Sequence, residues 1–258
     1  MSEALSARGD QDPAVWFREH FDDAADQVLT FLGDDRITFD DRTVADIGCG
    51  DGIIDLGLAI KGRPRKLVGY DLRETDVDAL RRAAAAAGVA DELPESLSFA
   101  VSQPDRVPAE NDAFDVVVTW SVFEHVTHPA VMLSEVSRVL KPDGVFFLQL
   151  WPFFHSEHGG HLWPHYDELF PHLRHADAAI REQVRGRRGT DPTRDAVDEY
   201  ESLNRISLDQ LHRALLAAGL TVTKLELLAG AIHIPRELGY LPLNLVGIGG
   251  VKLLAVPR

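Results

Sequence analysis

Residues 43–52 read Thr-Val-Ala-Asp-Ile-Gly-Cys-Gly-Asp-Gly, and this stretch decides the fold. An apolar segment that contains Asp46 runs into glycines at positions 48, 50 and 52. Glycines here allow a sharp turn with unusual backbone dihedrals and let a ligand approach bare backbone. A second apolar segment, residues 66–70, ends in Asp71, which lies 19 positions after Gly52. That is close to the ~20-residue spacing at which a nucleotide-binding βαβ unit places a carboxylate on ribose hydroxyls.

The charges around this glycine turn indicate which nucleotide it would bind. Dinucleotide-binding turns read G-x-G-x-x-G and place a pyrophosphate at the helix end, whereas here the glycines alternate and position 53 is Ile. Asp46 and Asp51 bracket the turn with negative charge, which disfavours a pyrophosphate and favours a cation. S-adenosylmethionine fits, because it is an adenosine that carries a sulfonium and an ammonium but no phosphate. The alternative is a tight turn that binds no ligand.

Composition limits the classes of protein that remain. A chain of 258 residues with 45% hydrophobic content predicts one domain with an insertion, and the net charge of -15 argues against a nucleic-acid partner. The one cysteine, Cys49, leaves no disulfide within the chain and no C-x-x-C metal site, which favours a reducing compartment. We find no apolar run of the ~18 residues that a membrane span needs and no signal peptide at the start. We therefore expect a cytoplasmic protein that has no membrane partner.

Strand-like and helix-like segments alternate along the chain. This alternation predicts an α/β fold with a doubly wound, mostly parallel seven-stranded sheet. The last two strands have no clear helix between them, so we expect an antiparallel edge strand there. Residues 1–11 are expected to be disordered and residues 12–258 to form the domain, with an amphipathic helix at 13–32 across the mouth of the sheet. The expected strands cover residues 43–47, 66–70, 97–101, 114–119, 145–150, 221–228 and 248–256.

The motif D-x-G-x-G-x-G from Asp46, followed by Asp71 after the second strand, resembles the class I (Rossmann-like) S-adenosylmethionine-dependent methyltransferases. Residues 114–126 are similar to that family's fourth strand and exit loop, and residues 135–144 to its next helix and turn. The resemblance covers about residues 40–150, and residues 206–258 in outline. One departure is Gln103, which stands where the family usually has an acid near the adenine amino group; its amide oxygen can still accept from that amine.

The resemblance implies a role for each matching position. Asp46 and the backbone of Gly48 and Gly50 would hold the amino-acid end of the cofactor, and Asp71 the ribose. The remaining implied contacts are Leu72, Ser102 and Gln103 beside adenine, Trp120 and Ser121 beside the methyl donor, and His125 close to the pocket. Gln103 has the alternative role of a turn residue before Pro104, and His125 that of a partner for backbone groups at the start of the next helix.

Six of the 11 histidines lie between positions 155 and 175, mixed with aromatic residues, in a long segment that follows strand five. We expect residues 151–205 to form a helical lid insertion. A lid histidine is a candidate general base, because its ordinary pKa is near 6.5, and we name His158, His161 and His155. The pair Gly159-Gly160 would let a substrate come close. A metal is not predicted, because these glycines and Pro164 prevent the helix that would align the histidines. The third interpretation is that the histidines only bond backbone or solvent.

These observations predict methyl transfer from S-adenosyl-L-methionine, leaving S-adenosyl-L-homocysteine, to a small-molecule acceptor. The preferred acceptor is a hydroxyl oxygen of a sugar or secondary metabolite, in a protein that is a monomer or homodimer. Alternatives are N- or C-methylation of a small molecule, a non-catalytic cofactor-binding protein of the same fold, and a nicotinamide-dependent oxidoreductase, which Ile53 disfavours. The arginine run between 181 and 194 is either a solvated loop or a site for an anionic substrate group.

Overall fold

The computed structural model describes residues 13–190 and 194–258, and it contains a seven-stranded sheet of order β3-β2-β1-β4-β5-β7-β6. The predicted disorder of residues 1–11 lies outside the described residues. All seven predicted strands are present and most pair in parallel, so the predicted fold class is confirmed. The strands are β1 Thr43–Ile47, β2 Lys66–Asp71, β3 Leu97–Val101, β4 Phe114–Trp120, β5 Leu140–Leu150, β6 Leu220–Leu228 and β7 Gly250–Pro257.

The centre of the sheet sets the position of the site. β1 pairs in parallel with β2 on one side and with β4 on the other, so the winding reverses between β1 and β4. Ligands of open α/β sheets bind at such a switch point, outside the carboxyl ends of the strands. β7 runs antiparallel to both β5 and β6, which confirms the antiparallel hairpin at this edge. Residues 141–144 bulge out of β5, because the register jumps from the pair Phe114↔Leu140 to the pair Val116↔Val145.

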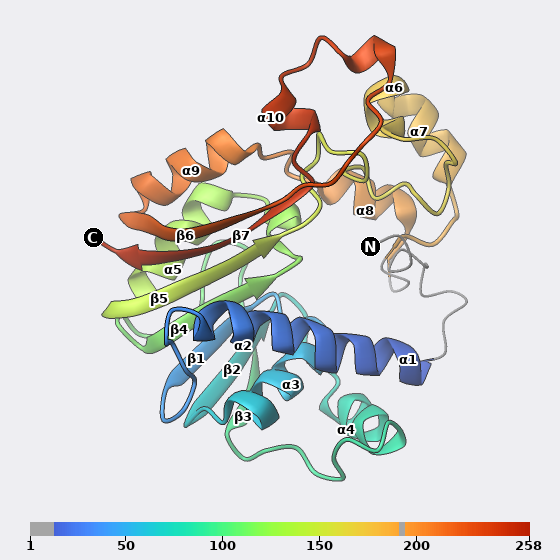
Figure 1. Cartoon of the computed structure of the whole chain (residues 1–258). Helices are drawn as coiled ribbons and strands as arrows, with labels where there is room; N and C mark the ends of the chain where they lie inside the picture. The colour runs from blue at the N-terminus through green and yellow to red at the C-terminus, as the bar shows by residue number, and fades with distance from the viewer. Residues whose placement is uncertain (1–12, 191–193) are drawn as a thin grey trace.

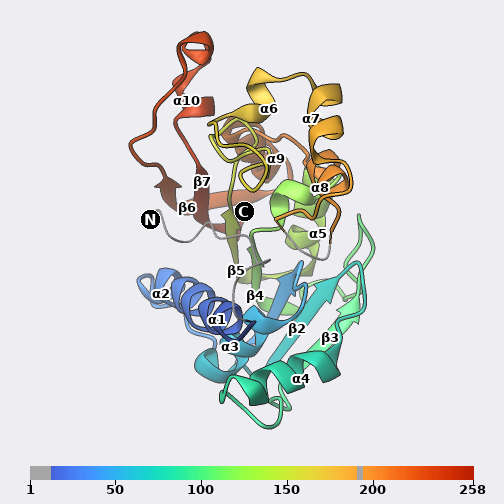
Figure 2. The same cartoon turned by 90° about the vertical axis from the view of Figure 1, so that its right-hand side faces the viewer.

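Helices cover both faces of the sheet (Figures 1 and 2). On one face α5 and α9 bury residues such as Leu133, Leu211 and Leu215 against β4, β5 and β7. The opposite face is covered by α2 and α3, with α4 packed beside α3. This layering explains why Val116, Val117 and Val118 of β4 are all buried, as a strand between two helical layers should be. The helices are α3 Ile53–Gly62, α4 Val77–Ala86, α5 Pro129–Val139 and α9 Leu208–Ala217.

The N-terminal helix forms as predicted, but its second half, α2, lies elsewhere than expected. Its parts are α1 Pro13–Arg18, the π-helical segment η2 Glu19–Ala24 and α2 Ala25–Gly33. We expected it across the mouth of the sheet, whereas Val28, Phe31 and Leu32 of α2 pack on the face of the sheet, with the Phe31 ring edge-on to Phe147. That face would otherwise expose its apolar side chains to water, and covering it is worth about 25 cal/mol per Å² of apolar surface.

Residues 151–205, which we call the lid, contain α6 Pro171–Arg174, α7 Asp177–Val184 and α8 Ala196–Ser202. The helices expected in this segment are therefore present. The lid has its own small apolar cluster, which includes Phe154, Ile180 and Tyr200, and Figure 1 shows it beyond the carboxyl ends of the parallel strands. The segment between β6 and β7, with η4 Arg236–Leu238 and α10 Leu243–Val246, packs against the lid through Phe170.

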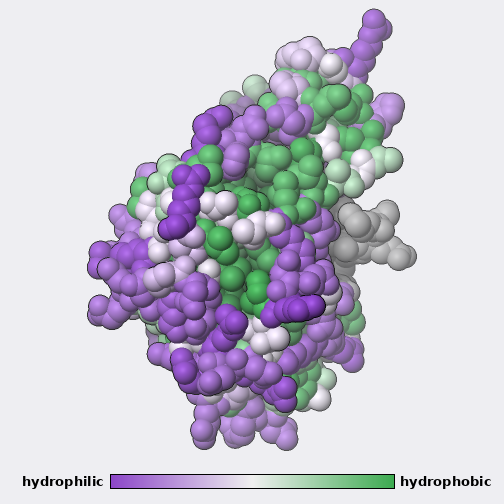
Figure 3. Space-filling view, turned by 60° about the vertical axis from the view of Figure 1, so that its left-hand side comes forward, coloured by the Kyte–Doolittle hydropathy of each residue, from purple (hydrophilic) through white to green (hydrophobic). Residues whose placement is uncertain are grey.

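Apolar residues also reach the surface. Leu225 and Leu227 on the edge strand β6 are about half exposed, and Tyr240 and Leu243 beyond it are largely exposed. Figure 3 shows apolar surface gathered on one face of the molecule, flanked by polar regions. Across residues 13–190 and 194–258, none of the helices combines the length and the apolar character required to span a bilayer.

Candidate functional site

The glycine turn after β1 is built as the sequence requires. Gly48, Gly50 and Gly52 have positive φ angles of 88°, 55° and 78°, a region in which residues with a side chain are strained. A Cβ on Gly48 would meet the Val122 side chain at 2.5 Å, whereas a Cβ on Gly50 would meet nothing within 4 Å. The turn is held against β2, because the Gly48 N–H donates to the Tyr70 carbonyl at 2.7 Å. Gly50 therefore presents open backbone at the switch point.

Asp46 lies beneath this turn and is 3% exposed. Its carboxyl group lies against that of Asp55 on α3, which is fully buried, and burial raises the pKa of Asp46 to about 7. The pKa of Asp55 is raised as well, first by burial and then by the charge of Asp46. One Asp46 oxygen has no hydrogen-bond partner among the described residues, so it remains an acceptor for an ammonium group that reaches the turn.

The ends of β2 and β3 form the next wall of the site. Asp71 is half-buried, and its two carboxylate oxygens accept from the Gly50 N–H at 3.0 Å and from the Arg73 N–H at 3.2 Å. Leu72 and Val101 beside it are 57% and 53% exposed. Two exposed, large apolar side chains next to a carboxylate suit a nucleoside site. The base can cover the apolar side chains, and the ribose hydroxyls can donate hydrogen bonds to the carboxylate.

The predicted adenine contacts also lie at this edge. The Ser102 N–H donates to the Asp71 carbonyl at 2.7 Å, which draws the segment after β3 towards β2. The side chain of Gln103 is exposed, and its backbone forms a small bridge with Arg106. Gln103 thus occupies a tight turn and still has its amide available to a ligand.

β4 leaves the sheet through a strained residue. Ser121 has a φ of 47°, and both its N–H and its hydroxyl donate to the side-chain oxygen of Gln149 at 2.8 Å. Gln149 is a buried residue of β5, and the sequence prediction did not include it. A lone glutamine in the apolar run Phe-Phe-Leu-Gln-Leu was the signal available. Trp120 was placed beside the methyl donor, but its ring stacks on Phe147 at 6.3 Å and so also packs with the core under α2.

The six lid histidines do not act as one group. His172 is buried edge-on to Phe154, and burial lowers its pKa to about 3. His165 bonds the Arg188 carbonyl, and His175 bonds Glu168 at the surface. Only His165 has the backbone partner that the third interpretation expected, whereas His175 bonds a side chain and the ring nitrogens of His172 make no hydrogen bond among the described residues. The arginine run is partly neutralised too, since Arg181 lies 3.5 Å from Glu201.

The three predicted bases, His155, His158 and His161, have different surroundings. His158 is half-buried between the rings of Trp151 and Trp163, at 6.1 and 5.7 Å, and burial lowers its pKa. His155 is half-buried beside Phe154, and burial lowers its pKa too. His161 is enclosed, with 7% of its surface exposed.

The glycine pair next to these histidines serves packing rather than substrate approach. A Cβ on Gly159 would lie 2.0 Å from the Phe154 carbonyl oxygen, and one on Gly160 would meet the His172 ring at 2.8 Å. The space that we expected to admit a substrate is filled by the lid itself, so that expectation was wrong.

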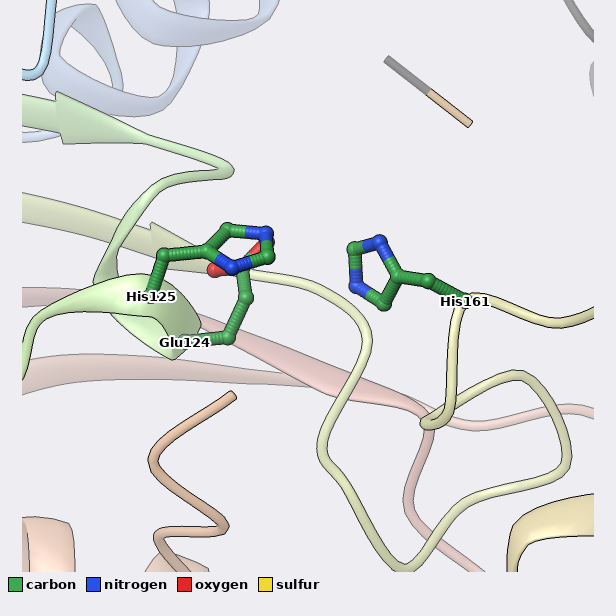
Figure 4. Close-up of side chains that lie close together, drawn as sticks. All are labelled: Glu124, His125 and His161. Carbon is green, nitrogen blue, oxygen red and sulfur yellow. The ribbon is translucent and has the colours of Figure 1, made fainter. Parts of the chain in front are cut away.

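His161 meets the exit of β4 in a buried polar cluster. The short helix η3 Phe123–His125 follows β4 and carries Glu124 and His125, whose ligand atoms lie within 4.8 Å of one another and of His161 (Figure 4). Nδ1 of His125 bonds the Ser202 hydroxyl at 2.7 Å, and Nδ1 of His161 faces Glu199 at 3.4 Å. We call Glu124, His125 and His161 the Glu–His–His cluster.

Burial is the largest influence on the pKa values of Glu124 and His125 in this cluster. It raises the pKa of Glu124 to about 8 and lowers that of His125 to about 3. Glu199 behaves in the opposite way, because hydrogen bonds from His161 and Thr190 outweigh its burial and lower its pKa to about 2. The sequence prediction placed His125 by the cofactor and His161 in the lid, and it missed both their proximity and Glu199. No local signal links residues that are 36 and 38 positions apart in the chain.

Comparisons with known proteins agree with this architecture. The family model described as "Methyltransferase domain" matches residues 17–225. The ubiquinone biosynthesis O-methyltransferase of Marinobacter nauticus is 26% identical over 168 residues, which are 58% of this chain and 68% of that protein. The protein of that name from Neisseria meningitidis serogroup A is 34% identical over 106 residues, 41% of this chain, and the match spans only 42% of that protein's length.

A solved structure shares the fold. The geranyl diphosphate C-methyltransferase of Streptomyces coelicolor, in complex with Mg²⁺, geranyl diphosphate and S-adenosyl-L-homocysteine, superimposes with a TM-score of 0.58 at 16% identity. The superposition covers 90% of this chain and 79% of that one. Sheet order, glycine turn and flanking carboxylates define a class I S-adenosylmethionine-dependent methyltransferase. Since the family model covers most of its length, the chain belongs to the methyltransferase domain family.

Proposed function

We propose that the protein binds S-adenosyl-L-methionine at the glycine turn and transfers its methyl group to a hydroxyl oxygen of a small molecule, such as a sugar or a secondary metabolite. The observation that carries the cofactor assignment is the exposed apolar pair Leu72 and Val101 beside Asp71. The negative charge at the turn favours a sulfonium donor over a pyrophosphate. Oxygen as the acceptor atom is supported by the two bacterial relatives, both named as O-methyltransferases.

Most of the predicted cofactor residues have a task in this proposal. The Asp71 carboxylate now accepts hydrogen bonds from the Gly50 and Arg73 N–H groups, and in this proposal the ribose hydroxyls replace these donors. The adenine ring lies on Leu72, next to Ser102 and Gln103. The amino-acid end lies over the open backbone at Gly50, with its ammonium group above the Asp46 carboxyl. Ser121, fixed by Gln149, then borders the methyl group.

The cofactor assignment is tested by calorimetry with S-adenosylhomocysteine. Asp71→Ala should weaken binding at least tenfold, which is about 1.4 kcal/mol, because a charge-assisted bond to the ribose is lost. The matched control is Glu74→Gln, an exposed acid three residues away, which should bind as the wild type does. An unchanged affinity in Asp71→Ala would remove the ribose assignment.

Among the three histidines, His158 is the base that we propose. Its ring is only half-buried and lies between two indole rings, which suit a ring-shaped acceptor. Because its pKa is lowered, the imidazole is neutral at pH 7 and able to accept the hydroxyl proton. His155 is the second choice, and His161 has little surface to offer a substrate.

His158→Gln should lower kcat by about 10²-fold or more and change KM little, if the imidazole takes the proton. The measurement is methyl transfer to a panel of phenols, sugars and amines, with His175→Gln as the control, since that histidine bonds Glu168 at the surface. Equal kcat in both variants would exclude His158 as the base. Transfer to amines alone would favour N-methylation instead.

A further inference from the structure

The Glu–His–His cluster has buried polar atoms without partners. Oε2 of Glu124 and Nε2 of His161 are both buried and make no hydrogen bond within the described part of the chain. The two residues are 4% and 7% exposed. A buried carboxylate or imidazole without a hydrogen-bond partner destabilises the folded protein, so such a pair in one place calls for a missing ligand.

The geometry of the cluster is convergent. The rings of His125 and His161 lie 5.0 Å apart at 74° to each other, and Figure 4 shows them facing one another with the Glu124 carboxyl beside the His125 ring. One ligand atom of each residue lies within 4.8 Å of the other two. Around a tetrahedral ion with bonds of about 2.0–2.2 Å, ligand atoms are about 3.3 Å apart. Side-chain movements of about 1 Å would therefore bring the three ligand atoms to bonding distance of one ion.

The outer partners of the two imidazoles are those of metal ligands. Nδ1 of His125 bonds the Ser202 hydroxyl, and Nδ1 of His161 faces the Glu199 carboxylate, so in each ring the other nitrogen is left for an ion. Metal-binding histidines nearly always bond a carboxylate, carbonyl or similar group through their second nitrogen, which fixes the ring and raises its basicity. Glu199 is itself held by the N–H and hydroxyl of Thr190.

The backbone of the cluster is also fixed. The Asn204 side chain donates to the carbonyls of Phe123 and Val126, at 2.8 and 2.9 Å, and its N–H donates to the Glu124 carbonyl. The segment after β4 is thus tied to the end of α8, which also carries Glu199 and Ser202. The charges beside the cluster are of both signs, Glu199 and Arg194, so neither sign dominates around it.

We propose that Glu124, His125 and His161 bind a divalent transition-metal ion, with Zn²⁺, Co²⁺, Fe²⁺ and Mn²⁺ as the chemically suited candidates. Two imidazoles and one carboxylate suit these ions better than Mg²⁺ or Ca²⁺, which prefer oxygen ligands. The three ligands leave at least one coordination position open, and two of them, Glu124 and His125, lie three and four residues along the chain from Ser121. The sequence disfavoured a metal because the lid histidines share no helix, but here two ligands come from the exit of β4 and only one from the lid.

The test uses the full chain, stripped with EDTA and dialysed, then titrated with each metal salt alone. Calorimetry and elemental analysis should give about one equivalent of Zn²⁺ or Co²⁺ per chain. The Co²⁺ form should show visible absorption bands of a four- or five-coordinate site. His161→Ala and Glu124→Gln should weaken Zn²⁺ binding more than tenfold, whereas His158→Ala, a neighbouring histidine outside the cluster, should bind as the wild type does.

Two further measurements keep the result decisive. Glu199→Gln leaves all three ligands in place and should still weaken binding about 10–100-fold, because it removes the outer partner of His161. Affinity for S-adenosylhomocysteine reports that each variant is folded. The same measurement separates this proposal from the proposed function, which concerns cofactor binding at the glycine turn. Wild-type protein that takes up none of the four ions, or cluster variants that bind Zn²⁺ as tightly as wild type, would overturn the metal site.

Discussion

Ser121 occupies a left-handed backbone conformation, and the buried side chain of Gln149 holds it there through two hydrogen bonds. Strained residues of this kind persist only where their surroundings enforce them, and they gather at functional sites. Ser121 directly precedes Val122, whose side chain packs against Gly48. The position of the β4 exit relative to the glycine turn therefore depends on Gln149.

Gln149→Leu removes the acceptor for both Ser121 donors. We expect a loss of about 1–3 kcal/mol in the free energy of unfolding, because a buried hydrogen-bond partner is lost. At ~2–4 °C per kcal/mol for a chain of this size, thermal unfolding should shift down by several degrees. Gln183→Leu, at an exposed position on α7, serves as the control and should unfold near the wild-type temperature. Equal midpoints for the two variants would contradict the role of Gln149.

At the residue scale, local sequence patterns were sufficient to predict where one half of the candidate site lies. Gly48, Gly50 and Asp71 follow from glycine spacing and from an acid at a strand end, because the turn and the strand are adjacent in the chain, whereas Leu72 follows from the family resemblance. Glu199 and Ser202 could not be predicted, since Glu199 meets His161 only when the lid folds on itself and Ser202 meets His125 only when the lid packs against η3. Residues that meet through tertiary packing carry no spacing signal in one sequence.

At the scale of elements, the lid depends on the close packing of its first turn. Residues 153–161 fold back so tightly that the Phe153 and Phe154 carbonyl oxygens lie where a Gly159 side chain would be. His158 and His161 flank the glycine pair, so the backbone at this point sets where both imidazoles lie. We infer that the glycines determine the shape of the lid and act on chemistry only through it.

Gly159→Ala should destabilise the protein by about 1–3 kcal/mol or more, because the added methyl group forces the backbone apart. Gly230→Ala is the matched control, since a Cβ there meets nothing within 4 Å and the residue has no positive φ. Thermal unfolding of both variants measures the difference. If Gly159→Ala unfolds at the temperature of Gly230→Ala, the turn is less tightly packed than described.

The boundaries of the helices and strands could largely be predicted from the sequence. The surface against which each helix packs could not always be predicted. The strands and helices follow from apolar periodicity and from glycine and proline at their ends, as in α5, which begins at Pro129. The placement of α2 was wrong, because an amphipathic pattern shows that a helix has a buried face but not which surface covers it. The same limit applied to the lid, whose helices were expected but whose contacts were not.

For the whole molecule, burial of ionisable groups links stability to pH. Asp46 and Asp55 lie against each other in the core, and burial raises the pKa of Asp46 to about 7 and that of Asp55 well above its ordinary value. A carboxyl group with a raised folded pKa contributes stability that is fully present below its unfolded pKa and is lost as pH rises through the folded value. His125 and His172 have lowered pKa values, so they act oppositely, but only up to their unfolded pKa near 6.5.

Above pH 7 the carboxyl pair should therefore dominate the pH dependence together with Glu124, because burial raises the pKa of Glu124 to about 8. We expect the free energy of unfolding, measured with urea, to fall by about 1 kcal/mol between pH 7 and 8.5, as the folded protein gives up protons that the unfolded chain has already lost. Asp55→Asn removes one charge from the pair and should flatten this profile in part, because Glu124 still titrates in the same range. Asp78→Asn, an exposed acid paired with Arg81 on α4, should leave the slope unchanged. A wild-type profile that is already flat over this range would mean that the buried carboxyl groups are already ionised at pH 7, which their burial opposes.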